Sequence, residues 1–227
     1  MQKLFFYLLV VIIACSCGRT AQQATDEQTP DSTLTISYAT GFKLDYFTHY
    51  KRITVFIPWQ KGKILSTYYL VTDKNTQTPD ASQTVRVPLT KLAVTSCTHF
   101  EFLAVLNELQ TVTGVCTPEL IYNETIATAY AEGKITSLGD AFNTNVERLL
   151  MLKPDALMLA SYNQQDDNAK HLATAGIPLL FNNEWTEQSL LGRAEWIKFV
   201  AAFYNKEAEA SQLFDAMAER YNAAKKV

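Results

Sequence analysis

The chain has 227 residues, of which 48% are hydrophobic and 19% charged, and its formal net charge is −3 at pH 7. This composition excludes a disordered chain and a collagen-like fibre, and the length suits one or two domains of about 100–200 residues each. The sequence has no run of lysine and arginine, so it does not predict nucleic-acid binding, which needs clustered cations to displace phosphate counterions.

The N-terminus has the pattern of an export signal: Met-Gln-Lys and then an apolar run from Leu4 to Ala14. That run is much shorter than the about twenty residues that cross a bilayer. Residues 12–15 (Ile-Ile-Ala-Cys) resemble the bacterial lipobox, in which the cysteine is lipidated, so Cys15 is the expected lipidation site and Cys17 the alternative. An ordinary cleaved signal is the competing interpretation.

These features predict a lipoprotein signal peptide at 1–14 and a flexible polar tether at 15–33. The mature protein would then be exported and face the periplasm, held to the bacterial cell membrane by its lipid anchor only.

Residues 34–90 are predicted to form a β-rich extension. Segments 52–58, 64–72 and 84–88 are rich in β-branched and aromatic residues, and Gly62 and the polar stretch 73–82 separate them. The simplest arrangement is an antiparallel sheet.

From Lys91 onward the pattern alternates between strand and helix. Strands are predicted at 91–96, 111–115, 156–160 and 177–181, and helices at 99–109, 124–132, 146–152 and 165–175. Such alternation predicts an α/β fold, a mostly parallel sheet with helices on both faces. From Thr186 the chain reads as helix to its end, with Asn205 as a break between two pieces.

One segment carries a family resemblance above the others. Residues 145–155 (Asn-Val-Glu-Arg-Leu-Leu-Met-Leu-Lys-Pro-Asp) combine a short helix, Lys-Pro-Asp and an apolar strand. Together with 91–101, 113–115, 137–139 and 171–178, they resemble the N-terminal lobe of the iron-chelate and vitamin B12 class of ABC-transporter substrate-binding proteins. The connecting helix of that class is matched by the chain after residue 185.

The resemblance implies one lobe of a class III periplasmic binding protein, which binds a solute and is not an enzyme. Its ligand would be a ferric siderophore, haem or cobalamin, and its partners an ABC permease and the associated ATPase. No cofactor is implied, because iron or cobalt would arrive with the ligand. A surface lipoprotein that acts as a protein-interaction module is the alternative.

In open α/β sheets, ligands bind beyond the carboxyl ends of the strands. The residues predicted there supply hydroxyl groups, amides and aromatic rings, which suit a large flat ligand with polar edges. The predicted ligand-binding residues are Thr98, His99, Thr117, Tyr122, Phe142, Ser161, Tyr162, Asn183 and Trp185. A capping or surface role is the alternative for His99, and Trp59 and Trp196 are expected in the core.

Two acidic residues match the position at which the family docks onto arginines of the permease, Asp166 and Asp167. Their alternative role is to stabilise a helix N-terminus through its dipole. Cys97 and Cys116 are expected either as a disulfide or as buried thiols. The three histidines are widely spaced, so no metal site is predicted.

The predicted lobe occupies 91–185 and the connecting helices 186–227, which leaves no residues for the C-terminal lobe that closes the family's cleft. We therefore expect a truncated binding protein that has half a ligand site and does not bind a chelate tightly by itself.

Overall fold

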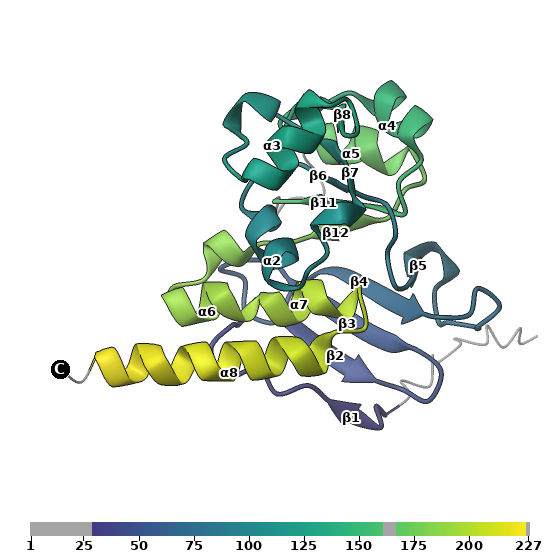
Figure 1. Ribbon diagram of the computed structural model, residues 1–227. Coiled ribbons are helices and arrows are strands. Elements are labelled where there is room, and N and C mark those ends of the chain that lie inside the picture. Colours follow the sequence, from purple (N-terminus) through teal and green to yellow (C-terminus); the bar gives the residue numbers. More distant parts are fainter. Residues whose placement is uncertain (1–28, 161–166, 226–227) are drawn as a thin grey trace, which may run out of the picture.

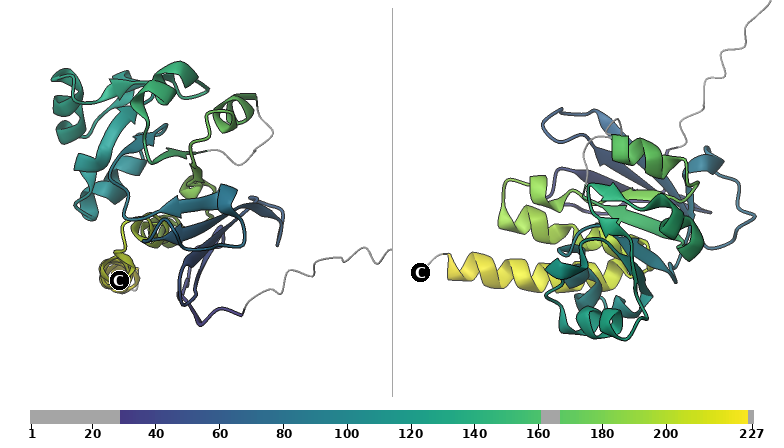
Figure 2. Two further views of the ribbon diagram at one scale, coloured as in Figure 1. Left: turned by 90° about the vertical axis from the view of Figure 1, so that its right-hand side faces the viewer. Right: turned by 90° about the horizontal axis from the view of Figure 1, so that it is seen from above.

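The structure is a computed structural model and describes residues 29–160 and 167–225 (Figure 1). It contains two five-stranded sheets, which we call the first sheet and the second sheet, and the C-terminal helices lie against the first of them (Figures 1 and 2).

The first sheet has the strand order β1-β2-β3-β4-β5. Its strands are β1 (Ser32–Thr33), β2 (Phe42–Tyr46), β3 (Lys51–Phe56), β4 (Ile64–Val71) and β5 (Thr84–Arg86). The predicted β-rich extension is confirmed, but the all-antiparallel arrangement is wrong for β5, which pairs parallel with β4. A long polar connection that includes the 3₁₀ helix η1 (Ala81–Gln83) carries the chain back to the start of β5. Strand β1 also lies within the stretch assigned to the tether.

The second sheet has the strand order β12-β11-β6-β7-β8, and all of its pairs are parallel. Its strands are β6 (Leu92–Val94), β7 (Val112–Val115), β8 (Thr136–Ser137), β11 (Ala156–Leu159) and β12 (Leu179–Phe181). A two-stranded antiparallel hairpin follows β8, formed by β9 (Gly139–Asp140) and β10 (Asn143–Thr144). The predicted parallel sheet is therefore confirmed.

Helices cover both faces of the second sheet because successive strand residues point to opposite sides. Ala93 and Leu157 pack in one cluster with helices α4 (Val146–Leu152) and α5 (Asp167–Ala173). Val94 and Met158 pack in the other cluster, with α2 (His99–Val105) and α3 (Glu124–Ala131). The uninterrupted apolar strand sequences follow from burial on both faces.

Local sequence signals fix several helix ends. The Asn145 side chain accepts a hydrogen bond from the Arg148 backbone N–H over 2.9 Å and so caps the N-terminus of α4. Gly133 follows α3 with a φ of +74°, which an L-residue with a Cβ adopts at a cost.

The C-terminal part consists of α6 (Leu190–Glu195), α7 (Ile197–Ala202) and α8 (Glu207–Ala224). The predicted break at Asn205 is confirmed, with φ of +58°, and a further interruption at Trp196 makes three helices of the two pieces expected. All six residues of α7 are buried.

Aromatic rings join α7 to the first sheet. The ring of Phe42 lies 4.9 Å from that of Trp196, and Trp196 lies 5.0 Å from Phe199. Gly41 allows this approach, because a Cβ at that position would lie 2.6 Å from the Trp196 ring. Residues 34–90, both faces of α7 and one face of the second sheet therefore share one hydrophobic core.

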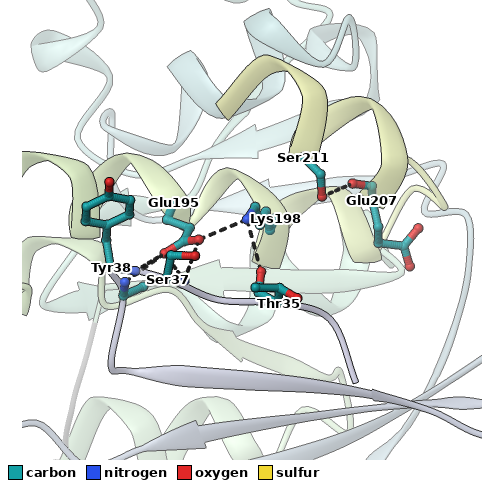
Figure 3. A network of polar contacts seen from close by, with 8 residues as sticks. Thr35, Ser37, Tyr38, Glu195, Lys198, Glu207 and Ser211 are labelled. Atoms are coloured by element: carbon teal, nitrogen blue, oxygen red, sulfur yellow. Dashed lines mark hydrogen bonds and ion pairs between the residues drawn. The ribbon is translucent and has the colours of Figure 1, made fainter. Parts of the chain in front are cut away.

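Two buried carboxylates fasten the loop between β1 and β2 to α6 and to the segment just before it. The Glu195 carboxylate accepts backbone N–H groups of Ser37, Tyr38 and Ala39 at 2.6–3.1 Å (Figure 3). Glu187 accepts the N–H groups of Thr40 and Gly41 at 2.9 and 2.8 Å. These bonds satisfy backbone donors that have no partner strand, so the loop is held in place although it is irregular.

Candidate ligand-binding surface

The carboxyl ends of the second sheet's strands form one edge of the lobe, which we call the carboxyl-end surface. It is made by the loops that follow β6, β7, β8 and β12. Three of its aromatic side chains are exposed to solvent: Phe142 by 90%, Tyr122 by 58% and Trp185 by 39%. Exposed large aromatic residues are costly in water, and their occurrence at this edge makes it the candidate ligand-binding surface.

Thr117 connects the loops that carry Tyr122 and Phe142. Its backbone N–H donates to the Gly139 carbonyl over 2.7 Å, and its hydroxyl accepts the Ala141 N–H over 3.2 Å. Thr117 has a φ of +48°, and this left-handed conformation turns the chain from β7 into the 3₁₀ helix η3 (Pro118–Leu120). The Phe142 backbone is in turn held by the Asp140 carboxylate, at 2.7 Å.

Thr98 connects the loops after β6 and β12. Its hydroxyl donates to the Glu184 carboxylate over 2.7 Å, and Glu184 begins the 3₁₀ helix η4 (Glu184–Thr186) that carries Trp185. Thr98 itself is exposed. The structure therefore places five predicted residues on the carboxyl-end surface: Thr98, Thr117, Tyr122, Phe142 and Trp185.

The structure does not place His99 and Asn183 on that surface, which corrects the prediction for both. His99 is fully buried and Asn183 is 1% exposed, so neither presents a side chain to a ligand here. His99 stands in the first turn of α2 beside Phe100, and the packing of Phe100 and Leu103 draws this turn into the core. A capping or surface role for His99 is equally wrong.

Burial shifts the pKa values of His99 and of the nearby Glu184. It lowers the pKa of His99 to about 4, so the imidazole is neutral near pH 7. Burial raises the pKa of Glu184, whose carboxylate lies 3.9 Å from His99 Nε2. Within the described residues, neither ring nitrogen of His99 has a hydrogen-bond partner.

Trp59 lies beside the carboxyl-end surface, next to Trp185, although the sequence suggested a core position for it. It lies in the turn between β3 and β4, is 66% exposed, and its ring centroid is 6.3 Å from that of Trp185, with the planes at 68°. Pro58 and Gly62 flank it and indicate a turn, which is the signal that could have placed the side chain outside. Trp196 is fully buried, as expected.

Several predicted residues lie outside the described part of the chain: Cys15, Cys17, Ser161, Tyr162 and Asp166. Asp167 is the first residue of α5. The roles predicted for these six residues stay predictions.

A separate cavity of about 740 Å³ lies between the first sheet and the edge strand β12. Tyr68 and Ser66 of β4, Thr84 of β5 and Lys170 of α5 are among the residues that line it. Because it opens beside β12 and the end of α5, it lies apart from the loops that carry Tyr122 and Phe142.

Neither metal ligation nor a disulfide is found within the described residues. No group of three or more histidine, cysteine or acidic side chains there is close enough to hold a metal ion, and Cys97 and Cys116 are free thiols. The same residues include no helix that is both long and apolar enough to cross a bilayer.

The family model described as periplasmic binding protein matches residues 92–227. The chain belongs to the periplasmic binding protein family, and its parallel sheet with flanking helices and a long C-terminal helix is the fold of that family.

Two relatives are uncharacterized lipoproteins of Methanocaldococcus jannaschii. One is 30% identical over 142 residues, which are 60% of this chain and 34% of the relative. The other is 23% identical over 257 residues, covering 100% of this chain and 63% of the relative. The chain thus spans about a third to two thirds of the length of these relatives.

Among solved structures, the petrobactin-binding protein YclQ of Bacillus subtilis has the same fold. It aligns with a TM-score of 0.53 and 13% identity, covering 77% of this chain and 53% of that chain.

Proposed function

We propose that the protein is the substrate-binding component of an ABC importer for a ferric chelate, such as a siderophore or haem, or for cobalamin. Membership of the periplasmic binding protein family supports a substrate-binding role. The observation that carries the ligand class is the group of exposed aromatic residues on the carboxyl-end surface.

The chemistry of that surface favours a large ligand with flat apolar faces and polar edges. Tyr122, Phe142 and Trp185 offer ring faces and edges, which give large contact area with few rotatable bonds. Thr98 and Thr117 add hydroxyl groups to the same surface, which can fix the orientation of a polar ligand edge. The lobe needs no chemistry of its own in this role, because binding and delivery are the whole task.

The proposal also covers the cellular location of the protein and its partners. The two lipoprotein relatives and the lipobox-like sequence at Cys15 support an exported protein held to the membrane by lipid, with Cys17 as the alternative site. Asp166 and Asp167 are proposed to dock onto the permease, whose ATPase would drive import.

Tryptophan fluorescence tests the binding role, since Trp59 and Trp185 are exposed near the proposed site. The chain is titrated separately with a ferric siderophore, haemin and cyanocobalamin, and the iron-free siderophore serves as a ligand control. We expect saturable but weak quenching by at least one of these classes, because a single lobe contacts the ligand from one side. Tyr122→Ala and Phe142→Ala are each expected to weaken that binding.

A matched variant separates site effects from general ones. Met151 is 76% exposed in the last turn of α4, away from the carboxyl-end surface, so Met151→Ala is expected to bind as the unaltered protein does. If no ligand class quenches saturably, the proposal fails and an interaction module becomes the better description. Equal losses in all three variants would contradict the placement of the site.

A further inference from the structure

We infer that Trp59, supplied by the hairpin of the first sheet, is a ligand-contacting residue that forms an aromatic corner with Trp185. The ligand portion that fits this corner is an aromatic ring system carrying negative charge. This inference rests on the proposed binding function and assigns it a residue outside the segment that the family model matches.

The backbone at Trp59 is unfavourable for a side chain of this size. Its φ of +61° lies in the left-handed region, which bulky residues rarely occupy because the Cβ crowds the following carbonyl oxygen. Core packing does not compensate for this strain, since the side chain is 66% exposed. Strain of this kind persists where the surrounding structure enforces it, and it concentrates at functional positions.

The surrounding turn enforces this conformation. The Ile57 N–H donates to the Lys63 carbonyl over 2.8 Å, and the Lys63 N–H donates to the Gln60 carbonyl over 3.0 Å. The Gln60 N–H donates to the Ile57 carbonyl over 3.2 Å, so the residues on both sides of Trp59 are tied together. The turn therefore presents the indole ring from a fixed backbone.

Trp185 is presented in a similar way from the other sheet. The Thr186 hydroxyl donates to the Asn183 carbonyl over 2.8 Å, and Glu184 is held by Thr98, so both neighbours of Trp185 are anchored. The two indole rings meet edge to face, with centroids 6.3 Å apart and planes at 68°. Two partly exposed rings at this angle form a corner, and a third aromatic ring can stack on one face while its edge meets the other.

The charge on the hairpin indicates which aromatic ligands suit the corner. Lys61 and Lys63 follow Trp59 in the turn, both are exposed, and residues 57–63 contain no acidic side chain. The acidic neighbour of Trp185, Glu184, is buried and bonded to Thr98. An aromatic anion therefore meets favourable ring contacts and positive charge on the same hairpin.

Calorimetry on the full chain tests this with two probes, the ferric complex of 2,3-dihydroxybenzoate and the ferric trihydroxamate of desferrioxamine. The first is an aromatic anion and the second has no aromatic ring. We expect Trp59→Ala to weaken binding of the catecholate complex about fivefold or more, a size typical of one aromatic contact, and to change hydroxamate binding less. Trp59→Phe should retain most of the affinity.

Two further variants distinguish the loss of a ligand contact from a general loss of stability. Ile64 is 58% exposed in the same hairpin, so Ile64→Ala is the matched truncation and should leave both affinities unchanged. Trp59→Gly removes the backbone strain, so its urea midpoint should rise while its affinity for the catecholate complex falls. A contact residue predicts these opposite directions, and a residue that serves stability does not.

The outcomes separate this inference from the proposed function. If the unaltered protein binds neither probe, this inference is overturned, whereas the proposed function fails only if haemin and cyanocobalamin do not bind either. If it binds the catecholate complex and Trp59→Ala binds it within twofold, only the role of Trp59 is overturned. Equal weakening of both probes would overturn the assignment of an aromatic anion.

Discussion

The Tyr68 hydroxyl on β4 donates a hydrogen bond to the Leu179 carbonyl oxygen on β12, over 2.8 Å. The same hydroxyl accepts the Phe181 backbone N–H over 3.0 Å. β12 is an edge strand of the second sheet, and its outer backbone groups have no neighbouring strand. One side chain of the first sheet thus takes the place of a strand and joins the two sheets.

This pairing predicts the result of removing a single oxygen atom. Tyr68→Phe leaves the Leu179 carbonyl and the Phe181 N–H without their partner, and a buried polar group left unpaired costs about 1–3 kcal/mol. We expect the free energy of unfolding in urea to fall by that amount. Tyr69→Phe, the next residue along β4 and only half-buried, is the control and should change stability little. Equal stability of the two variants would contradict the joining role.

The carboxylate of Glu195 is expected to be a major determinant of stability. Burial alone would raise its pKa, but the backbone N–H donors of the β1–β2 loop and Lys198 hold the pKa below its ordinary value. Lys198 is buried as well, and its Nζ lies 2.9 Å from the Glu195 carboxylate. Glu195→Ala therefore leaves a buried ammonium group without its counter-ion. Breaking such a pair costs about 3–5 kcal/mol.

The matched control for this variant is Glu219→Ala, because Glu219 is exposed on α8 and should contribute less than about 0.5 kcal/mol. Urea unfolding of both variants measures the difference. A Glu195→Ala protein as stable as the Glu219→Ala protein would show that the loop needs no carboxylate anchor.

His99 predicts a loss of stability in mild acid. Its folded pKa of about 4 lies below its unfolded value of about 6.5, so the unfolded chain binds the proton more strongly. The stabilising contribution is complete above pH 6.5 and is lost as the pH falls toward 4. Between pH 7 and pH 5 the expected loss is about 2 kcal/mol.

His99→Leu isolates this effect. The nearby Glu184 acts in the opposite direction, because its raised pKa favours proton uptake by the folded state, but it is present in both proteins. We therefore expect the unaltered protein to lose about 2 kcal/mol more than His99→Leu when urea unfolding is repeated at pH 7 and pH 5. Parallel losses in the two proteins would exclude His99 as the titrating group.

The two described cysteines should differ in reactivity. Burial raises the pKa of Cys116 to about 11, and this side chain is 3% exposed. Cys97 is half-buried, and burial raises its pKa as well. At pH 8, about one thousandth of Cys116 is thiolate, so a maleimide should modify Cys97 first. Peptide mass mapping over time measures both rates, and faster labelling of Cys116 would contradict the burial seen here.

The parallel sheet was predictable because burial on both faces leaves an unmistakable sequence pattern. The strand at 156–159 is apolar throughout, and Asn145 and Pro154 mark the ends of the helix before it. The hairpin at 139–144 was not predictable, because strands of two residues are too short to show a period of two.

The candidate site was predictable in position but not in orientation. The sequence placed Trp185 and Asn183 at the end of the same strand, yet one side chain is exposed and the other buried. Which of these two side chains points outward depends on how η4 turns, and the first residue of η4 is held by Thr98 from another loop. Trp59 was misplaced for the same reason, since its exposure depends on a turn and on contacts with a second sheet.

The Glu195 contact with Ser37 joins residues that are 158 positions apart in the chain. The first sheet is the earliest part to be synthesised, but its core includes Trp196, Phe199 and Phe203. Such long-range closure slows folding, because the entropy of the intervening loop is lost before the contacts form. During synthesis, residues 34–90 must therefore remain without their native core until the helices near residue 200 have emerged.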